Sequence, residues 1–172
     1  MQARRGREAK LFSMSTGLMH FAFLQILLGA LVAGIDAGRA FPTWPDMNGA
    51  LLPDVLMDSS QWHLDAFKHY DTNAFAPAIV QFVHRGVAYI LTAVVLIFTV
   101  KAFKQQPVGP AKVGFAILPV LLLVQVTLGI VTVINCIGTI PVSWGVLHQA
   151  GGVLLLANLV FVRHFCLPKG EN

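Results

Sequence analysis

Four long apolar runs constrain this chain more than any other feature of its sequence. They cover residues 12–34, 77–100, 113–134 and 143–165. Each approaches or exceeds the roughly 20 residues that an α-helix needs to cross the hydrocarbon core of a bilayer. The sequence therefore predicts an all-α membrane protein, a four-transmembrane-helix bundle that forms a single four-span domain over residues 1–172.

The composition supports contact with membrane lipid. Hydrophobic residues make up 56% of the chain and charged residues only 12%, whereas soluble domains carry about 25% charged residues. This chain has too few charges to cover a surface that faces water. The first apolar run also exceeds the 7–15 residues typical of a cleaved signal peptide, so we expect it to remain as a span.

The distribution of charge predicts the topology. Basic residues flank the runs at three places: Arg4, Arg5, Arg7 and Lys10; Lys101, Lys104 and Lys112; Arg163 and Lys169. The connection 35–76 is instead rich in aspartate. Because basic residues mark the cytoplasmic or matrix side, we expect both termini and the loop 101–112 inside, and 35–76 and 135–142 outside. The pI of about 9.4 therefore reflects topology and indicates no nucleic-acid partner.

Polar residues interrupt two of the runs near their outer ends. The second run contains Gln81, His84 and Arg85, and the fourth contains His148. Ionisable side chains inside a membrane are costly and usually face a packed interior where they have a function. These residues are therefore the candidate functional site.

The two histidines are predicted to lie at matched depth. His84 follows Pro77 by seven residues and His148 follows Ser143 by five, which at 1.5 Å per residue gives depths of roughly 10 and 8 Å. The second and fourth runs point the same way, so the two imidazoles can hold one haem iron from opposite sides. The alternative is that each histidine hydrogen-bonds a neighbouring helix. Glycines on the face of His148 leave room for a macrocycle: Gly145, Gly151 and Gly152.

The sequence leaves two binding partners open for each of the residues that follow these histidines, Arg85 and Gln149. Arg85 can pair with haem propionates or with a carboxylate of the outer connection, Asp36 or Asp46. Gln149 can hydrogen-bond a propionate or a backbone carbonyl.

The remaining histidines and both cysteines fit structural roles. We expect His20 to be structural, His164 to lie at the interface, and His63 and His69 to be solvated. Cys136 and Cys166 fall at opposite ends of a span, too far apart for a disulfide, which needs Cα atoms within about 7 Å.

An internal repeat relates the two halves of the chain. The first run contains Gln25 and Gly29, and the third contains Gln125 and Gly129, each pair on one helical face at i and i+4. Each such run is followed by an outside connection and a run with an early histidine. The bundle is therefore predicted to consist of two similar helix pairs. Ordinary packing of small and polar residues between membrane helices is the alternative explanation.

At these residues the chain resembles the haem A synthase family of cytochrome oxidase assembly proteins. The matching stretches lie in family order along nearly the whole chain: Leu28–Gly34, Phe41–Met47, Gln81–Arg85, Gln125–Thr132 and Leu147–Gly151. Family members usually have eight spans in two similar halves, and this chain resembles the second, C-terminal half.

The resemblance implies the chemistry. The family oxidises the methyl group of haem O to the formyl group of haem A, and its second half holds a b-type haem. By motif match, the resemblance implies that His84 and His148 are the axial iron ligands. It also implies that the protein lies in a bacterial plasma membrane or a mitochondrial inner membrane. The first half carries a carboxylate, tied to catalysis, where this chain has Gln81, so the catalytic residues stay unassigned. An electron donor and a second four-helix unit, either a homodimer partner or a missing N-terminal half, are implied as partners.

Two other function classes are alternatives to haem A synthesis. The first is a non-enzymatic bis-histidine membrane cytochrome, since iron with both axial positions filled suits electron transfer. Small di-haem cytochromes of that kind need four ligands, however, and this chain has one depth-matched histidine pair. A transporter usually needs an intramembrane carboxylate for coupling, and the Asp and Glu residues all lie outside the apolar cores.

Overall fold

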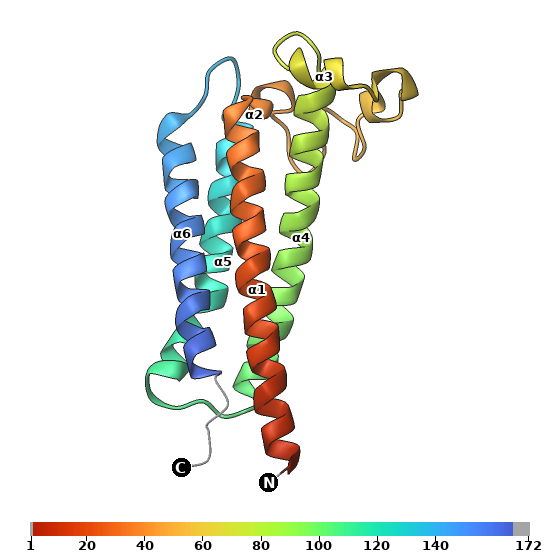
Figure 1. Cartoon of the computed structure of the whole chain (residues 1–172). Coiled ribbons are helices and arrows are strands. Elements are labelled where there is room, and N and C mark those ends of the chain that lie inside the picture. The colour runs from red at the N-terminus through yellow and green to blue at the C-terminus, as the bar shows by residue number, and fades with distance from the viewer. Residues whose placement is uncertain (1, 167–172) are drawn as a thin grey trace.

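A computed structural model describes the backbone of residues 2–166 and the side chains from residue 9 onward. Four long helices lie side by side in it (Figure 1): α1 (Gln2–Gly34), α4 (Phe75–Phe103), α5 (Gly109–Ile134) and α6 (Val142–Phe165). Each is long and apolar enough to cross a membrane. The predicted all-α fold with four spans is confirmed, and the chain is an integral membrane protein.

The ends of the four helices lie close to the ends of the apolar runs, with one difference. Helix α1 begins at Gln2 and therefore includes the basic residues that precede the first apolar run. Lys and Arg are compatible with a helix, and nothing in this stretch stops it. Helix α1 is therefore longer than the apolar run inside it.

The packing of the helices places α4 and α6 at opposite corners of the bundle. Helix α1 packs against α4 and α6, and α5 packs against the same two helices. Neighbouring helices are antiparallel, so α4 and α6 run in the same direction, from the end that carries α2 and α3 (Figure 1). We call this the loop end and the other the terminal end. The expectation that the second and fourth spans are parallel is confirmed.

The apolar core occupies the half of the bundle nearer the terminal end. Its largest fully buried side chains are Phe98, Leu118, Leu159, Val95 and Val162. Two buried hydroxyls bond carbonyls of their own helices, Ser15 to Phe12 O at 2.8 Å and Thr99 to Val95 O at 2.9 Å. The half of the bundle nearer the loop end contributes nothing to this cluster.

The connection between α1 and α4 is folded rather than extended. It contains α2 (Ala37–Ala40), η1 (Asp54–Leu56), η2 (Ser59–Gln61) and α3 (Leu64–Lys68). These elements cover the start of α4 through a small second core: Phe41, Met47, Leu56, Ala66, Phe75 and Ala78. The rings of Trp62 and Phe67 meet the Phe75 ring edge-on, at centroid distances of 5.1 and 5.3 Å.

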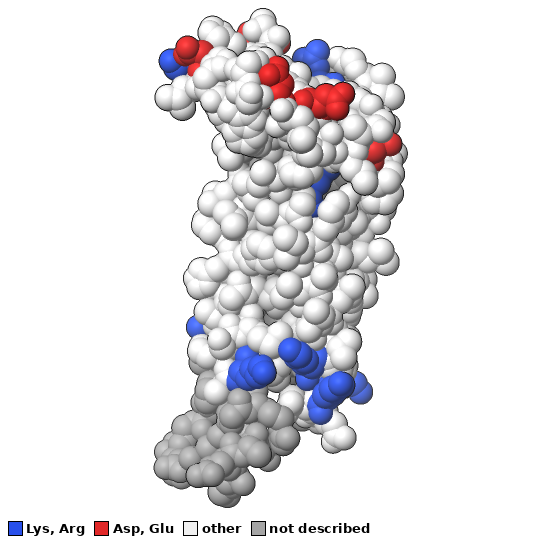
Figure 2. Space-filling view, turned by 90° about the vertical axis from the view of Figure 1, so that its right-hand side faces the viewer, with Lys and Arg blue, Asp and Glu red and all other residues white. Residues whose placement is uncertain are grey.

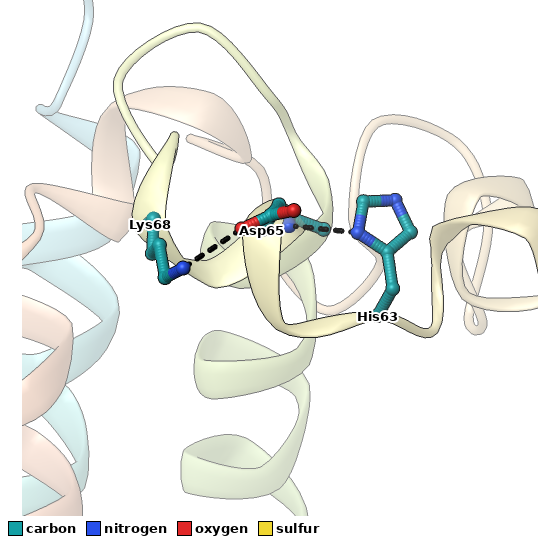
Figure 3. Close-up of polar contacts among 4 residues, drawn as sticks. His63, Asp65 and Lys68 are labelled. Carbon is teal, nitrogen blue, oxygen red and sulfur yellow. Dashed lines mark hydrogen bonds and ion pairs between the residues drawn. The ribbon is translucent and has the colours of Figure 1, made fainter.

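Histidines of this connection have local roles (Figure 3). His63 precedes α3, and its Nδ1 accepts a hydrogen bond from the Ala66 N–H at 3.3 Å, which caps the helix. Asp65 and Lys68 form an ion pair on the exposed face of the same helix. His69 follows α3 and is exposed. Both histidines are at the solvated surface, as the sequence predicted.

Charges separate along the bundle (Figure 2). On the face shown, acidic residues gather at the loop end and basic residues cluster at the terminal end, with a nearly uncharged surface between them. This separation is the pattern from which the positive-inside rule predicts orientation. Both cysteines are free, Cys136 just after α5 and Cys166 at the end of α6.

Close packing between α5 and α6 gives a test of the fold. A Cβ at Gly114 would lie 2.8 Å from the ring of Phe161 and 2.9 Å from a methyl of Val162, whereas one at Gly17 would meet nothing within 4 Å. We expect Gly114→Val to cost about 1–3 kcal/mol through overpacking and to lower the Tm in detergent. The same substitution at Gly17 is the control and should leave the Tm nearly unchanged. Equal Tm values for the two variants would contradict this packing.

Candidate functional site

His84 and His148 meet in the half of the bundle nearer the loop end. Their ring centroids lie 6.5 Å apart and their planes are nearly perpendicular, at 86°. One ring comes from α4 and the other from α6, so the two side chains approach each other from opposite corners of the bundle. The structure thus brings together the two histidines that the sequence paired. That they bind iron stays a prediction.

Helix α1 holds His84. The Gln25 side-chain amide donates to the main-chain oxygen of His84 at 3.0 Å, and its nitrogen lies 3.1 Å from Nδ1 and 3.4 Å from Nε2 of the ring. One turn further along α1, a Cβ at Gly29 would lie 3.2 Å from the His84 ring. The ring therefore rests against helix α1 at a point where no side chain intervenes.

Helix α5 holds His148 in the corresponding way. The main-chain oxygen of Gln125 lies 3.2 Å from His148 Nδ1. A carbonyl oxygen can only accept, so Nδ1 carries the proton and Nε2 presents its lone pair. A Cβ at Gly129 would lie 2.8 Å from the ring, too close for any side chain without movement. This position requires glycine.

The internal repeat thus has a physical meaning that its sequence pattern only partly revealed. The glutamine and glycine at i and i+4 bind and seat the histidine of the following span, in both halves. The pattern is visible in the sequence, whereas this contact is not. The available signal was the spacing itself, because one helical face can present both residues to one neighbouring ring.

Three buried glutamine oxygens lack hydrogen-bond partners among the described residues: the Oε1 atoms of Gln25, Gln81 and Gln125.

Gln125 also changes the interpretation of two glycines. A Cβ at Gly151 would collide with the Gln125 amide oxygen, and one at Gly152 would lie 3.3 Å from its nitrogen. The room predicted beside His148 is therefore occupied at Gly151 and Gly152, while Gly145 has nothing within 4 Å.

Arg85 binds the outer connection through main-chain oxygens. Its Nη1 donates to Asp46 O at 2.7 Å and its Nη2 to Phe41 O at 3.0 Å. Gln81, which is 2% exposed, donates to the same Phe41 oxygen at 3.2 Å. Among the described residues no ion pair joins Arg85 to Asp36 or Asp46; its pairing with a carboxylate or with haem propionates stays a prediction. The Arg85 guanidinium thus donates to main-chain carbonyl oxygens of the outer connection.

The carboxylate of Asp46 has other partners. It accepts hydrogen bonds from Thr43 Oγ1 at 2.7 Å and from the Gly49 N–H at 3.1 Å. These two bonds, with the nearby positive charge of Arg85, hold the pKa of Asp46 below its ordinary value. Phe41 is only 7% exposed. Its side chain packs in the small second core with Met47 and Phe75.

The other predicted site residues lie apart from the histidine pair. Gln149 is exposed on α6, and its proposed contact with a propionate stays a prediction. His20 Nδ1 donates to Thr16 O of its own helix at 2.9 Å. His164 is exposed beside Phe165 near the end of α6. From residue 9 to residue 166, no group of three or more His, Cys, Asp or Glu side chains is placed to hold a metal ion.

Two neighbouring imidazoles suit a metal whose remaining ligands belong to a bound cofactor and not to the protein. A bare zinc site needs at least three protein ligands, whereas haem iron takes only axial ligands from the protein. Imidazole nitrogens bind metals at about 2 Å and lie about 1 Å from the ring centre, so two rings sharing one metal have centres about 6 Å apart. The observed centroid distance of 6.5 Å is close to that separation, while the edge of each ring that carries the two nitrogens lies against Gly29 or Gly129.

Comparison with known proteins identifies the family of this chain. The sequence model of a family described as "Cytochrome oxidase assembly protein" matches residues 1–160. The chain belongs to this family. No solved structure gives a significant match.

Curated relatives of this family member carry the name "Heme A synthase". The chain is 41% identical to the Paracoccus denitrificans protein over 164 residues, which is 95% of this chain and 40% of that protein. It is 43% identical to a Ruegeria protein over 164 residues, again 95% of this chain and 40% of the relative. The chain therefore spans about two fifths of the length of the curated relatives that it matches.

The bonds from Arg85 predict how the outer connection responds to mutation. Hydrogen bonds to charged groups contribute about 1.5–3 kcal/mol, so Arg85→Gln should speed amide exchange in residues 41–50 by about tenfold or more. Hydrogen–deuterium exchange with mass spectrometry measures this. The exposed Arg39 provides the control, and Arg39→Gln should leave exchange in this segment unchanged. Unaltered protection in Arg85→Gln would show that other contacts hold the segment.

Proposed function

We propose that this chain is a haem-binding four-helix unit of a haem A synthase, in which His84 and His148 hold one b-type haem. The observation that carries the proposal is the pair of imidazoles 6.5 Å apart, projecting from two parallel helices across the bundle. Membership of the cytochrome oxidase assembly family and identity near 40% to proteins named "Heme A synthase" support it.

The residues around the pair suit this role. Main-chain Gln125 fixes His148 with its proton on Nδ1, which leaves Nε2 for iron. Such an outer partner orients a ligating histidine and raises its basicity. The apolar core on the terminal-end side of the histidines keeps water from reaching them through the bundle. The positive charge of Arg85, next to His84 in sequence, and the amide of Gln149 are the candidate partners for the propionates.

A haem held by His84 and His148 would supply electron transfer, because two histidine ligands would leave no iron position open for oxygen. We therefore infer that the oxidation of the haem O methyl group to the haem A formyl group takes place at a second four-helix unit. The chain spans about 40% of its relatives' length, and the resemblance places a catalytic carboxylate where this chain has Gln81. That unit is either a second copy of this chain or an N-terminal half.

The orientation and location follow from the same proposal. Basic residues gather at the terminal end of the bundle (Figure 2), so we place both termini on the cytoplasmic or matrix side. The membrane is a bacterial plasma membrane or a mitochondrial inner membrane. An electron donor completes the set of partners, with haem O as substrate and haem A as product.

The ligand assignment is tested by substitution. Purified in detergent and loaded with haem, the wild-type chain should give a reduced-minus-oxidised spectrum of a low-spin b-type haem. His84→Ala and His148→Ala should each remove that spectrum, since one imidazole cannot complete the axial pair. His20→Ala is the control, because the His20 ring bonds only its own helix, and it should retain the spectrum.

The outcome of that experiment decides the haem proposal directly. A spectrum that survives either His84→Ala or His148→Ala would contradict the ligand assignment. Formation of haem A in cells that lack their own haem A synthase activity distinguishes an enzyme unit from a non-enzymatic cytochrome. We expect formation only when a second four-helix unit is present.

A further inference from the structure

A cleft between α1 and α4 at the terminal end gathers positive charge that the proposed function does not use. Its volume is about 180 Å³, and it lies at the opposite end of the bundle from the histidine pair. Its lining residues recur at helical spacing on both helices, so each helix turns one face toward the cleft. They are Lys10, Leu11 and Met14 of α1, and Lys101, Lys104 and Gln105 around the end of α4.

The three lysines of this cleft have no anionic partner among the described side chains. From residue 9 to residue 166, every Asp and Glu belongs to the connection between α1 and α4, at the loop end. Lys101 Nζ lies 4.0 Å from the sulfur of Met14, which is only a weak acceptor. Arg163 of α6 differs, since its Nε donates to Thr16 Oγ1 at 2.9 Å. Like charges that line one cleft repel one another, and an anion bound between them relieves that repulsion.

The walls of the cleft are apolar, and its charges lie at the level of the membrane surface. Leu11 belongs to the apolar core of the bundle, and Met14 packs against that core. Lys10 lies near the start of the apolar span of α1, and Lys101 near the end of the span of α4. Lysine side chains at such positions lay their stems along apolar surface and keep the ammonium group in the polar region. The cleft therefore presents positive charge at the bilayer surface and apolar side chains toward the acyl chains.

We propose that this cleft binds the headgroup of an anionic phospholipid, such as phosphatidylglycerol. The lipid phosphate lies among the three ammonium groups, and the acyl chains run along α1 and α4. Basic pockets between membrane helices on the cytoplasmic side suit this ligand, because that leaflet carries the anionic lipids. The apolar walls favour a lipid over free phosphate, which makes no apolar contact. The inference does not depend on haem binding.

Native mass spectrometry of the full chain in detergent tests the proposal. The probes are phosphatidylglycerol and, as a zwitterionic control with the same acyl chains, phosphatidylcholine. We expect the chain to retain one phosphatidylglycerol and to bind phosphatidylcholine at least about fivefold more weakly. Lys101→Gln and Lys104→Gln should each weaken phosphatidylglycerol binding by about fivefold, the contribution of one basic residue near a membrane surface. Lys104→Arg keeps the charge and should keep the affinity.

Lys112 provides the matched control. It is exposed near the start of α5, at the same end of the bundle, and it does not line the cleft. Lys112→Gln removes the same charge as Lys104→Gln and should leave phosphatidylglycerol binding unchanged. Inorganic phosphate, added at the concentration of the lipid, should not displace it.

Three results would overturn the proposal. Equal retention of the two lipids would show that the headgroup charge is not recognised. Equal loss of affinity in Lys104→Gln and Lys112→Gln would show a general attraction to basic surface and no site in the cleft. Displacement of the lipid by inorganic phosphate would assign the cleft to a free anion. The lysines are exposed, so these variants should fold like the wild type, which circular dichroism checks.

Discussion

The hydrocarbon core of a bilayer offers no hydrogen-bond partners, so a polar side chain at that depth is stabilised by partners within the bundle. His84 and His148 satisfy this constraint through the helices beside them, α1 and α5. Close approach requires glycine at the contact, and a Cβ at Gly129 would come within 2.8 Å of the ring. The position of the two rings is thus fixed by α1 and α5, against which the Cε1 edges of His84 and His148 lie.

The same constraint explains why the bundle is divided along its length. Near the terminal end, side chains such as Phe98, Leu118 and Leu159 fill the interior and hold the four helices together. Near the loop end, imidazoles and glutamine amides take their place. Arg85 connects this polar half to the folded segment outside it by bonding the carbonyls of Phe41 and Asp46. The apolar core and the candidate functional site therefore lie in different halves of one bundle.

Much of this arrangement could be predicted from the sequence, because the spans, their directions and the level of each histidine depend on run lengths and helical rise alone. What could not be predicted depends on how each helix is rotated about its axis. The pattern around His148 left open whether Gly151 and Gly152 face a void or a neighbour, and Gln125 occupies that space. Similarly, Arg85 was expected to find a carboxylate or a propionate. It finds main-chain oxygens, which every residue carries and no sequence pattern marks.

The central claim is that two imidazoles, held across the bundle with nearly perpendicular planes, share one iron. Electron paramagnetic resonance of the ferric, haem-loaded chain tests it most directly, since the signal reports both the axial ligands and the angle between their planes. With planes at 86°, the account predicts a highly anisotropic low-spin signal that is typical of perpendicular axial imidazoles. A high-spin signal, or the rhombic low-spin signal of parallel imidazole planes, would contradict it.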